Sequence, residues 1–158
     1  MEEPSAGIKQ VLQRHETYGI DTMAFIYHFE NNPTYTLFTK PLFQVIEAGK
    51  ARGVTSTLSV MEILVKPKEI GNISAAEDYK YVLTNFPNLR IRNLDLEVAE
   101  KAAEIRAKYH LRPPDAIQIG TALVEDADAF ITNDSKLKRV DEIEIIVMKD
   151  LVETNRKS

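Results

Sequence analysis

The sequence predicts a three-layer α/β/α sandwich, in which helices cover both faces of a central, mostly parallel sheet of about five strands. Three observations support this fold class. Short β-forming runs alternate with segments of helical periodicity along the chain. Most neighbouring runs are separated by a predicted helix, as parallel strands joined by crossovers are. The 158 residues are also enough for one domain with a substantial core.

The expected elements follow from hydrophobic spacing and from the polar residues that bound each run. The expected strands are 17–20, 53–57, 88–94, 129–132 and 143–148. The expected helices are 8–15, 24–29, 38–49, 59–65, 74–86, 95–109 and 113–125. We expect a single domain over residues 1–158, with residues 1–16 as an N-terminal helical extension and residues 150–158 as a loose tail.

Two helix starts carry the Ser-x-x-Glu pattern of a capping box. They are Ser59 with Glu62, and Ser74 with Glu77. Pro67 is expected to end the first of these helices. Both helices are therefore predicted to begin at a serine.

The helix expected over 113–125 is predicted to be mostly buried, because its polar side chains form only a narrow stripe of Gln118, Thr121 and Glu125. Two small residues one turn apart, Ala116 and Gly120, would let it lie close against another element. Asp115 stands in its first turn, where an aspartate favours the helix start even without any catalytic role.

Composition limits the possible functions. The chain has no cysteine, so disulfides and thiolate metal sites are excluded. Its three histidines are far apart in sequence, and this spacing disfavours a zinc site. The net charge of −4 disfavours nonspecific coating of nucleic acid. With no membrane-spanning stretch and no secretory signal pattern, the expected location is the cytoplasm.

Four acidic residues are predicted to meet at one edge of the sheet, because the carboxyl ends of parallel strands share an edge. They are Asp21, Glu62, Asp115 and Asp134. Each alone is readily explained as a cap or turn residue. Together they would repel one another without a cation, and oxygen ligands alone favour Mg²⁺ or Mn²⁺.

At these residues the chain resembles the PIN domain family, the fold of the toxin nucleases of VapBC-type toxin–antitoxin pairs. The resemblance covers residues 20 to about 147. It is carried by four blocks: Ile20-Asp21-Thr22 with Phe25-Ile26-Tyr27; Thr55 to Ser59 with Glu62; Lys108-Tyr109 through Pro114-Asp115-Ala116 and Thr121-Ala122-Leu123; and Ala127 to Asp134. The family usually has Asn or Ser two residues after the first Asp, where this chain has Met23.

The resemblance implies a PIN-like Mg²⁺- or Mn²⁺-dependent endoribonuclease whose catalytic and metal-binding acids are Asp21, Glu62, Asp115 and Asp134. It also implies a cognate antitoxin and a homodimer. The residues expected to position the carboxylates are Thr22, Ser59, Thr132 and Asn133. The expected contacts to RNA phosphates are Lys66, Arg112, Lys136 and Lys138, each of which could equally be a solvated surface charge.

Two alternatives differ from this hypothesis in class. Met23 and the acidic balance favour a PIN-like scaffold that binds RNA or protein without catalysis. A phosphatase of the haloacid dehalogenase type would also place an Asp after its first strand, but it needs a second Asp at position 23. The aromatic side chains of Phe25, Tyr27 and Phe29 are expected to make core or dimer contacts.

Overall fold

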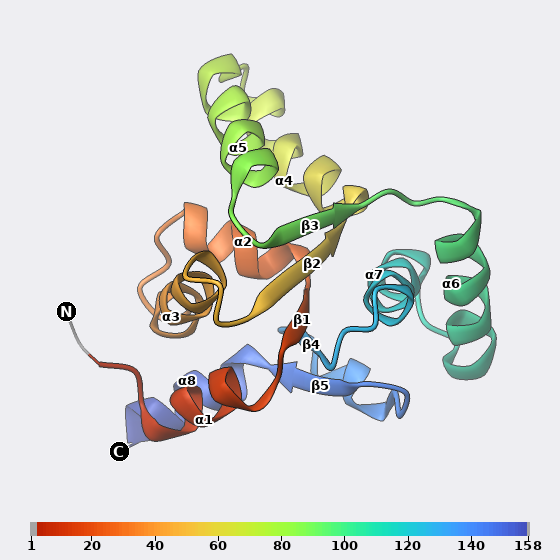
Figure 1. Cartoon of the computed structure of the whole chain (residues 1–158). Helices are drawn as coiled ribbons and strands as arrows, with labels where there is room; N and C mark the ends of the chain where they lie inside the picture. Colours follow the sequence, from red (N-terminus) through yellow and green to blue (C-terminus); the bar gives the residue numbers. More distant parts are fainter. Residues whose placement is uncertain (1–2, 158) are drawn as a thin grey trace.

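The computed structural model describes residues 3–157, with side chains up to residue 153. Its centre is one parallel five-stranded sheet of order β3-β2-β1-β4-β5 (Figure 1). The strands are β1 (Thr17–Ile20), β2 (Arg52–Ser56), β3 (Leu89–Arg92), β4 (Ala129–Thr132) and β5 (Glu144–Val147). The predicted fold class is therefore confirmed.

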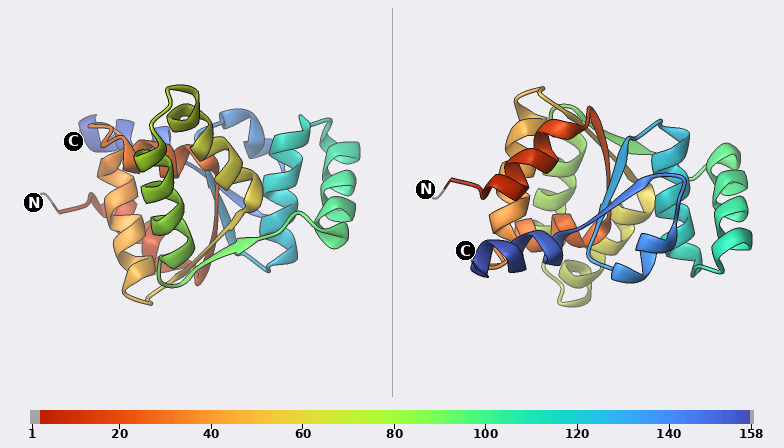
Figure 2. Two further views of the ribbon diagram at one scale, coloured as in Figure 1. Left: turned by 90° about the horizontal axis from the view of Figure 1, so that it is seen from above. Right: turned by 90° about the horizontal axis from the view of Figure 1, so that it is seen from below.

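Helices cover both faces of this sheet. They are α1 (Ala6–Arg14), α2 (Thr22–Phe29), α3 (Thr36–Glu47), α4 (Thr57–Glu69), α5 (Ile73–Asn85), α6 (Leu96–Tyr109), α7 (Pro113–Val124) and α8 (Met148–Lys157), with the 3₁₀ helix η1 (Ser135–Arg139) after β4. Helices α6 and α7 lie on one side, and α1, α3 and α8 on the other (Figure 2). Within the described residues, no helix is both long and apolar enough to cross a membrane.

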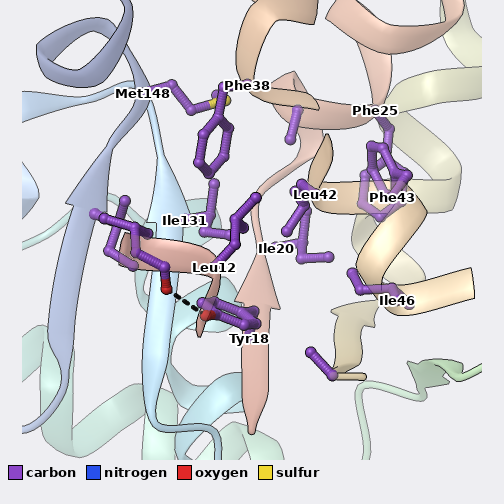
Figure 3. Close-up of a cluster of buried hydrophobic side chains, with 14 of the residues drawn as sticks. Leu12, Tyr18, Ile20, Phe25, Phe38, Leu42, Phe43, Ile46, Ile131 and Met148 are labelled. Atoms are coloured by element: carbon purple, nitrogen blue, oxygen red, sulfur yellow. Dashed lines mark hydrogen bonds between the residues drawn. The ribbon is translucent and has the colours of Figure 1, made fainter. Parts of the chain in front are cut away.

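The larger core lies beneath α1, α2, α3 and α8. Leu12, Phe38 and Met148 from three of these helices gather around Ile20 and Ile131 of the central strands (Figure 3). The hydroxyl of Tyr18 donates to the carbonyl of Val11, as the dashed line in Figure 3 marks. The buried phenol is thus satisfied, as burial of a polar group requires.

The second core lies beneath α6 and α7 and depends on close approach of these two helices. A Cβ atom added at Gly120 would lie 2.9 Å from the backbone nitrogen of Ala102, so no larger residue fits between α6 and α7. The predicted close contact at Gly120 is therefore confirmed.

Four local predictions were wrong. Ser56, and not Ser59, caps α4 by accepting from the backbone N–H of Leu58, and α4 continues through Pro67 to Glu69. Asn72, and not Ser74, caps α5. Residues 148–157 form α8 where a loose tail from residue 150 was expected; Met1, Glu2 and Ser158 lie outside the described residues.

Candidate active site

The candidate site lies where the strand order reverses, beyond the carboxyl ends of β1 and β4. These neighbouring strands pair in parallel, with Ile20 opposite Ile131. The backbone N–H of Asp21 continues the ladder by donating to the carbonyl of Ile131 at 2.9 Å. In open parallel sheets, such a switch point forms a crevice in which ligands bind.

A cavity of about 480 Å³ opens at this point. All four predicted acids line it, although they come from three helix starts and the body of a fourth helix. Its full lining is Asp21, Thr22, Met23, Ile26, Tyr27, Glu62, Arg112, Pro114, Asp115, Gln118, Thr132, Asn133 and Asp134. The fold therefore brings the acids to one cavity.

Asp21 is held by two hydrogen bonds and caps α2. Its Oδ1 accepts from the backbone N–H of Thr22 at 2.8 Å, and its Oδ2 accepts from the hydroxyl of Thr132 at 2.8 Å. Burial raises the pKa of Asp21 to about 6, and the negative charges of Asp115 and Glu62 add to this rise. The two hydrogen bonds lower the pKa but do not offset burial. Asp21 therefore faces the other acids in a poorly solvated position.

Glu62 lies in the body of α4 and is fixed from α2. Its Oε1 accepts from the hydroxyl of Thr22 at 2.7 Å. Thr22 therefore contacts two of the four acids, through its backbone with Asp21 and through its side chain with Glu62. Thr22 therefore links the start of α2 to Glu62 of α4.

Ser59 is buried and contacts no carboxylate directly. Its Oγ lies 2.8 Å from the hydroxyl of Thr55 and 3.0 Å from that of Thr22. Thr55 in turn donates to the carbonyl of Ile20 at 2.7 Å. Ser59 therefore acts on Glu62 only through Thr22, and it ties α4 to the end of β1.

Gln118 is the site residue that the sequence analysis missed. Its amide Nε2 donates to Ser59 Oγ at 2.8 Å and to Thr22 Oγ1 at 3.2 Å, and its side chain is buried. Gln118 follows Asp115 by three residues, so the two share one face of α7. That spacing was the available signal.

Asp115 lies in the first turn of α7 but does not cap it. Arg112 is the N-cap residue and makes no side-chain capping bond. Instead, its Nε donates to Asp115 Oδ2 at 3.2 Å. Asp115 is thus free of a structural capping role, and its charge is balanced by Arg112 at the cavity wall.

Asp134 combines a capping role with its place in the cavity. Its Oδ1 accepts from the backbone N–H of Lys136 at 3.0 Å, which caps η1. Its own N–H donates to Thr132 Oγ1 at 3.2 Å. Because Thr132 also donates to Asp21, this one hydroxyl connects the chain segments that carry two of the acids.

Among the residues that the structure describes, the side chain of Asn133 hydrogen-bonds to none of the four acids. Its amide bonds instead to the hydroxyl of Tyr27, at 3.1 Å, and to the backbone of Lys149, at 2.9 Å. It lines the cavity beside Tyr27, between the end of β4 and the first turn of α8.

Of the four side chains expected to contact RNA phosphates, only Arg112 belongs to a residue that lines the cavity in the described structure. Lys66 and Lys138 do not line the cavity; Lys66 pairs with Glu30 at 3.1 Å, and Lys138 pairs with Asp150 at 2.5 Å. Lys136 is exposed at the start of η1.

The donor set fits a hard divalent cation, since four carboxylates share one cavity without histidine or cysteine. In the part of the chain that the structure describes, however, no three acidic or histidine side chains are close enough to hold an ion as they stand. Without a cation between them the four carboxylates repel one another, and Asp115 forms an ion pair with Arg112 instead. Small side-chain movements would be needed to bring the ligands together.

Comparison with known proteins agrees with this geometry. The family model described as PIN domain matches residues 18–143. The chain belongs to the PIN domain family. Helix α1 and helix α8 lie outside the part of the chain that this PIN domain model matches. A search of curated proteins gave no match.

Solved structures share the PIN fold of this chain at low identity. A chain of a toxin–antitoxin complex from Klebsiella pneumoniae is 22% identical, with a TM-score of 0.62, and the match covers 84% of this chain and 97% of that one. A chain of VapBC2 from Rickettsia felis, bound to a promoter DNA fragment, is 15% identical with a TM-score of 0.61. The match covers 83% of this chain and 98% of that one. A chain of DNA-bound VapBC from Salmonella typhimurium is 21% identical with a TM-score of 0.61. The match covers 84% of this chain and 98% of that one.

Proposed function

We propose that this PIN domain is a metal-dependent endoribonuclease that hydrolyses RNA phosphodiester bonds at the cavity between β1 and β4. The supporting observation is that Asp21, Glu62, Asp115 and Asp134 line that one cavity at the switch point of the sheet. Such a concentration of carboxylates is costly to the fold without a cation, and the charges of Asp115 and Glu62 add to the rise in the pKa of Asp21 that burial causes.

Asp21 and Asp115 would hold Mg²⁺ or Mn²⁺ directly, while Glu62 and Asp134 would hold the ion or orient its waters. When bound, the cation polarises the phosphodiester and lowers the pKa of a coordinated water. Thr22 and Thr132 keep the two oxygens of Asp21 in place, and Thr22 also fixes Glu62. With a pKa of about 6, Asp21 is ionised at neutral pH and ready to bind a cation.

The test is cleavage of RNA by the purified full chain with Mn²⁺ or Mg²⁺. Chelator should abolish cleavage, and Asp115→Asn should lower the rate by about 100-fold or more, since even residues outside the ligand set commonly cost 10- to 100-fold. Asp126→Asn is a matched control, because Asp126 is exposed, lies outside the cavity and has a φ of 55° that asparagine accepts. Equal cleavage by Asp115→Asn and the wild type would refute the site.

The structural neighbours are chains of a toxin–antitoxin complex and of VapBC assemblies, and this supports a further proposal, that the chain is the toxin of a type II pair. Its partners would be RNA, a cognate antitoxin and a second copy of itself, in the cytoplasm. Co-expression with a small DNA-binding protein encoded beside it should yield a stable complex and suppress RNA cleavage. Light scattering of the free chain would report the expected dimer.

The non-catalytic scaffold is the second candidate, and it is favoured by the absence of a ready-made three-ligand group among the described residues. Metal titration separates the two. Mn²⁺ binding that depends on Asp21 and Asp115, without turnover of any RNA, would support the scaffold and refute the nuclease.

A further inference from the structure

Tyr27 places a phenol at the wall of the cavity that holds the four acids. It lies on α2, and its ring stacks on Tyr35 with a centroid distance of 4.2 Å and an interplanar angle of 15°. Its hydroxyl oxygen lies 3.1 Å from the side-chain amide of Asn133, with which it forms a hydrogen bond. Contacts on the ring face and at the hydroxyl therefore fix the side chain before any ligand binds.

The direction of the Asn133 hydrogen bonds can be assigned from donor chemistry. A backbone N–H can only donate, so the atom of Asn133 facing the N–H of Lys149 at 2.9 Å must be the amide oxygen. The amide nitrogen, which has hydrogens to donate, must then face Tyr27. Tyr27 accepts this hydrogen bond with its phenol oxygen.

This assignment leaves the hydrogen of the Tyr27 hydroxyl without an acceptor. Among the residues that the structure describes, the Tyr27 hydroxyl makes no hydrogen bond other than the one it accepts from Asn133. A rigid, partly buried donor with an unused hydrogen at the edge of a ligand cavity is a typical means of orienting a ligand.

We propose that Tyr27 is a substrate-binding residue that donates its hydroxyl hydrogen to a phosphate oxygen of the bound RNA strand. The proposal rests on the nuclease function proposed above. Tyrosine hydroxyls are among the groups that commonly contact nucleic-acid phosphates. A neutral donor suits this site, because a cation beside the acids is drawn into an ion pair, as Arg112 is with Asp115.

From the sequence, Tyr27 is expected to make a core or dimer contact. The ring does pack against Tyr35, but Tyr27 also lines the cavity, and its hydroxyl is bonded to Asn133, which lines the same cavity. The structure therefore separates an apolar ring that stabilises α2 from a polar end that is available to substrate.

The test compares two variants that remove the same Tyr27–Asn133 hydrogen bond. Tyr27→Phe keeps the stacked ring but loses the donor. Asn133→Ala keeps the donor but also deprives the Lys149 N–H of its acceptor, so it does more damage to the fold. Tyr35→Phe is a control, since it removes a neighbouring phenol hydroxyl while preserving the stacked pair.

Binding is measured by fluorescence anisotropy, with a short labelled single-stranded RNA and Mn²⁺, in full-length chains that all carry Asp115→Asn to prevent cleavage. Tyr27→Phe should weaken binding about five- to tenfold, the loss of one net hydrogen bond. Asn133→Ala should weaken it by a smaller factor despite a lower melting temperature. Tyr35→Phe should bind as its parent does.

The ranking decides the outcome. Tyr27→Phe binding at least threefold more weakly than the parent, and more weakly than Asn133→Ala, supports the proposal; any other ranking overturns it. If the ranking overturns the role of Tyr27 while the parent binds RNA and the wild type cleaves it, the nuclease function still stands. A parent that binds no RNA, with a wild type that cleaves none, refutes both.

Discussion

The guanidinium Nε of Arg112 lies 3.2 Å from Oδ2 of Asp115, and both residues line the cavity shared with the other three acids. Arg112 is mostly exposed, whereas the side chain of Asp115 is only 17% exposed. The pair therefore joins an exposed surface cation to a poorly solvated carboxylate. A divalent cation and Arg112 would compete for the same oxygen.

Replacing Arg112 should affect metal and RNA in opposite directions. Arg112→Ala should tighten Mn²⁺ binding about three- to tenfold, because Asp115 loses a competing cation. It should also raise the KM for RNA, because a phosphate contact is lost. Calorimetric Mn²⁺ titration and steady-state cleavage measure the two effects. Arg106→Ala on α6, outside the cavity, makes the same charge change and should do neither; unchanged or weaker Mn²⁺ binding in Arg112→Ala would contradict the competition.

Neutralising Asp21 should stabilise the metal-free protein above pH 7. The folded pKa of about 6 lies above the usual carboxyl value near 4, so the folded state binds more protons than the unfolded state between these pH values. The free energy of unfolding therefore falls as pH rises through this window. In chelator at pH 7.5, Asp21→Asn should be about 2–3 kcal/mol more stable than the wild type, with little difference near pH 4.

Urea unfolding at both pH values measures this effect. The difference between the two proteins cancels the other groups that titrate in the same range. Asp126→Asn, at an exposed position, should show no such pH-dependent gain. A wild type that is more stable than Asp21→Asn at pH 7.5 in chelator would show that the carboxylate is not strained by its surroundings.

Gln118 should matter more to the site than another buried polar residue of the same helix. Gln118→Met removes the amide that bonds to Ser59 and Thr22 but keeps the length of the side chain. It should weaken Mn²⁺ binding and lower RNA cleavage about 10-fold, the scale of residues that position metal ligands. Thr121→Val is the matched control, because the Thr121 hydroxyl bonds only to the carbonyl of Ile117 in its own helix. Equal losses in both variants would reduce Gln118 to a structural role.

Gly120 should tolerate no side chain. A Cβ atom there would meet the backbone of Ala102 at 2.9 and 3.1 Å, and backbone cannot move aside as a flexible side chain can. Gly120→Ala should lower the free energy of unfolding by about 1–3 kcal/mol. Gly7→Ala, in α1 with no atom closer than 4.0 Å, should raise it by about 0.5–1 kcal/mol. Denaturant unfolding would contradict this packing if both variants changed stability in the same direction.

Hydrophobic pattern was sufficient to predict the sheet. Strands β1 and β4 have the bounds that were expected, because a short β-forming run between two predicted helices favours a buried strand. The convergence of the four acids followed from the topology of parallel strands, and their shared cavity agrees with it.

Helix ends and the buried polar network were less predictable. The capping-box pattern indicated Ser59, but in the structure Ser56 caps α4 and Ser59 is buried beside Thr55 and Gln118. Pro67 lies inside α4, where packing outweighs its intrinsic cost to a helix. Gln118 was assigned to a polar stripe because helical periodicity cannot distinguish a side chain facing water from one facing polar groups of another helix.

The contact between α1 and α8 brings the first and last helices of the described chain together. The turn between α4 and α5 lies far away from them, exposed, with Gly71 at a φ of 72° (Figure 1). Joining the ends and opening the chain at Gly71 would preserve every strand pairing. The same cut without joining would give two fragments, one carrying Asp21 and Glu62 and the other Asp115 and Asp134. Neither fragment would hold a complete site, so nuclease activity could be made conditional on bringing the two halves together.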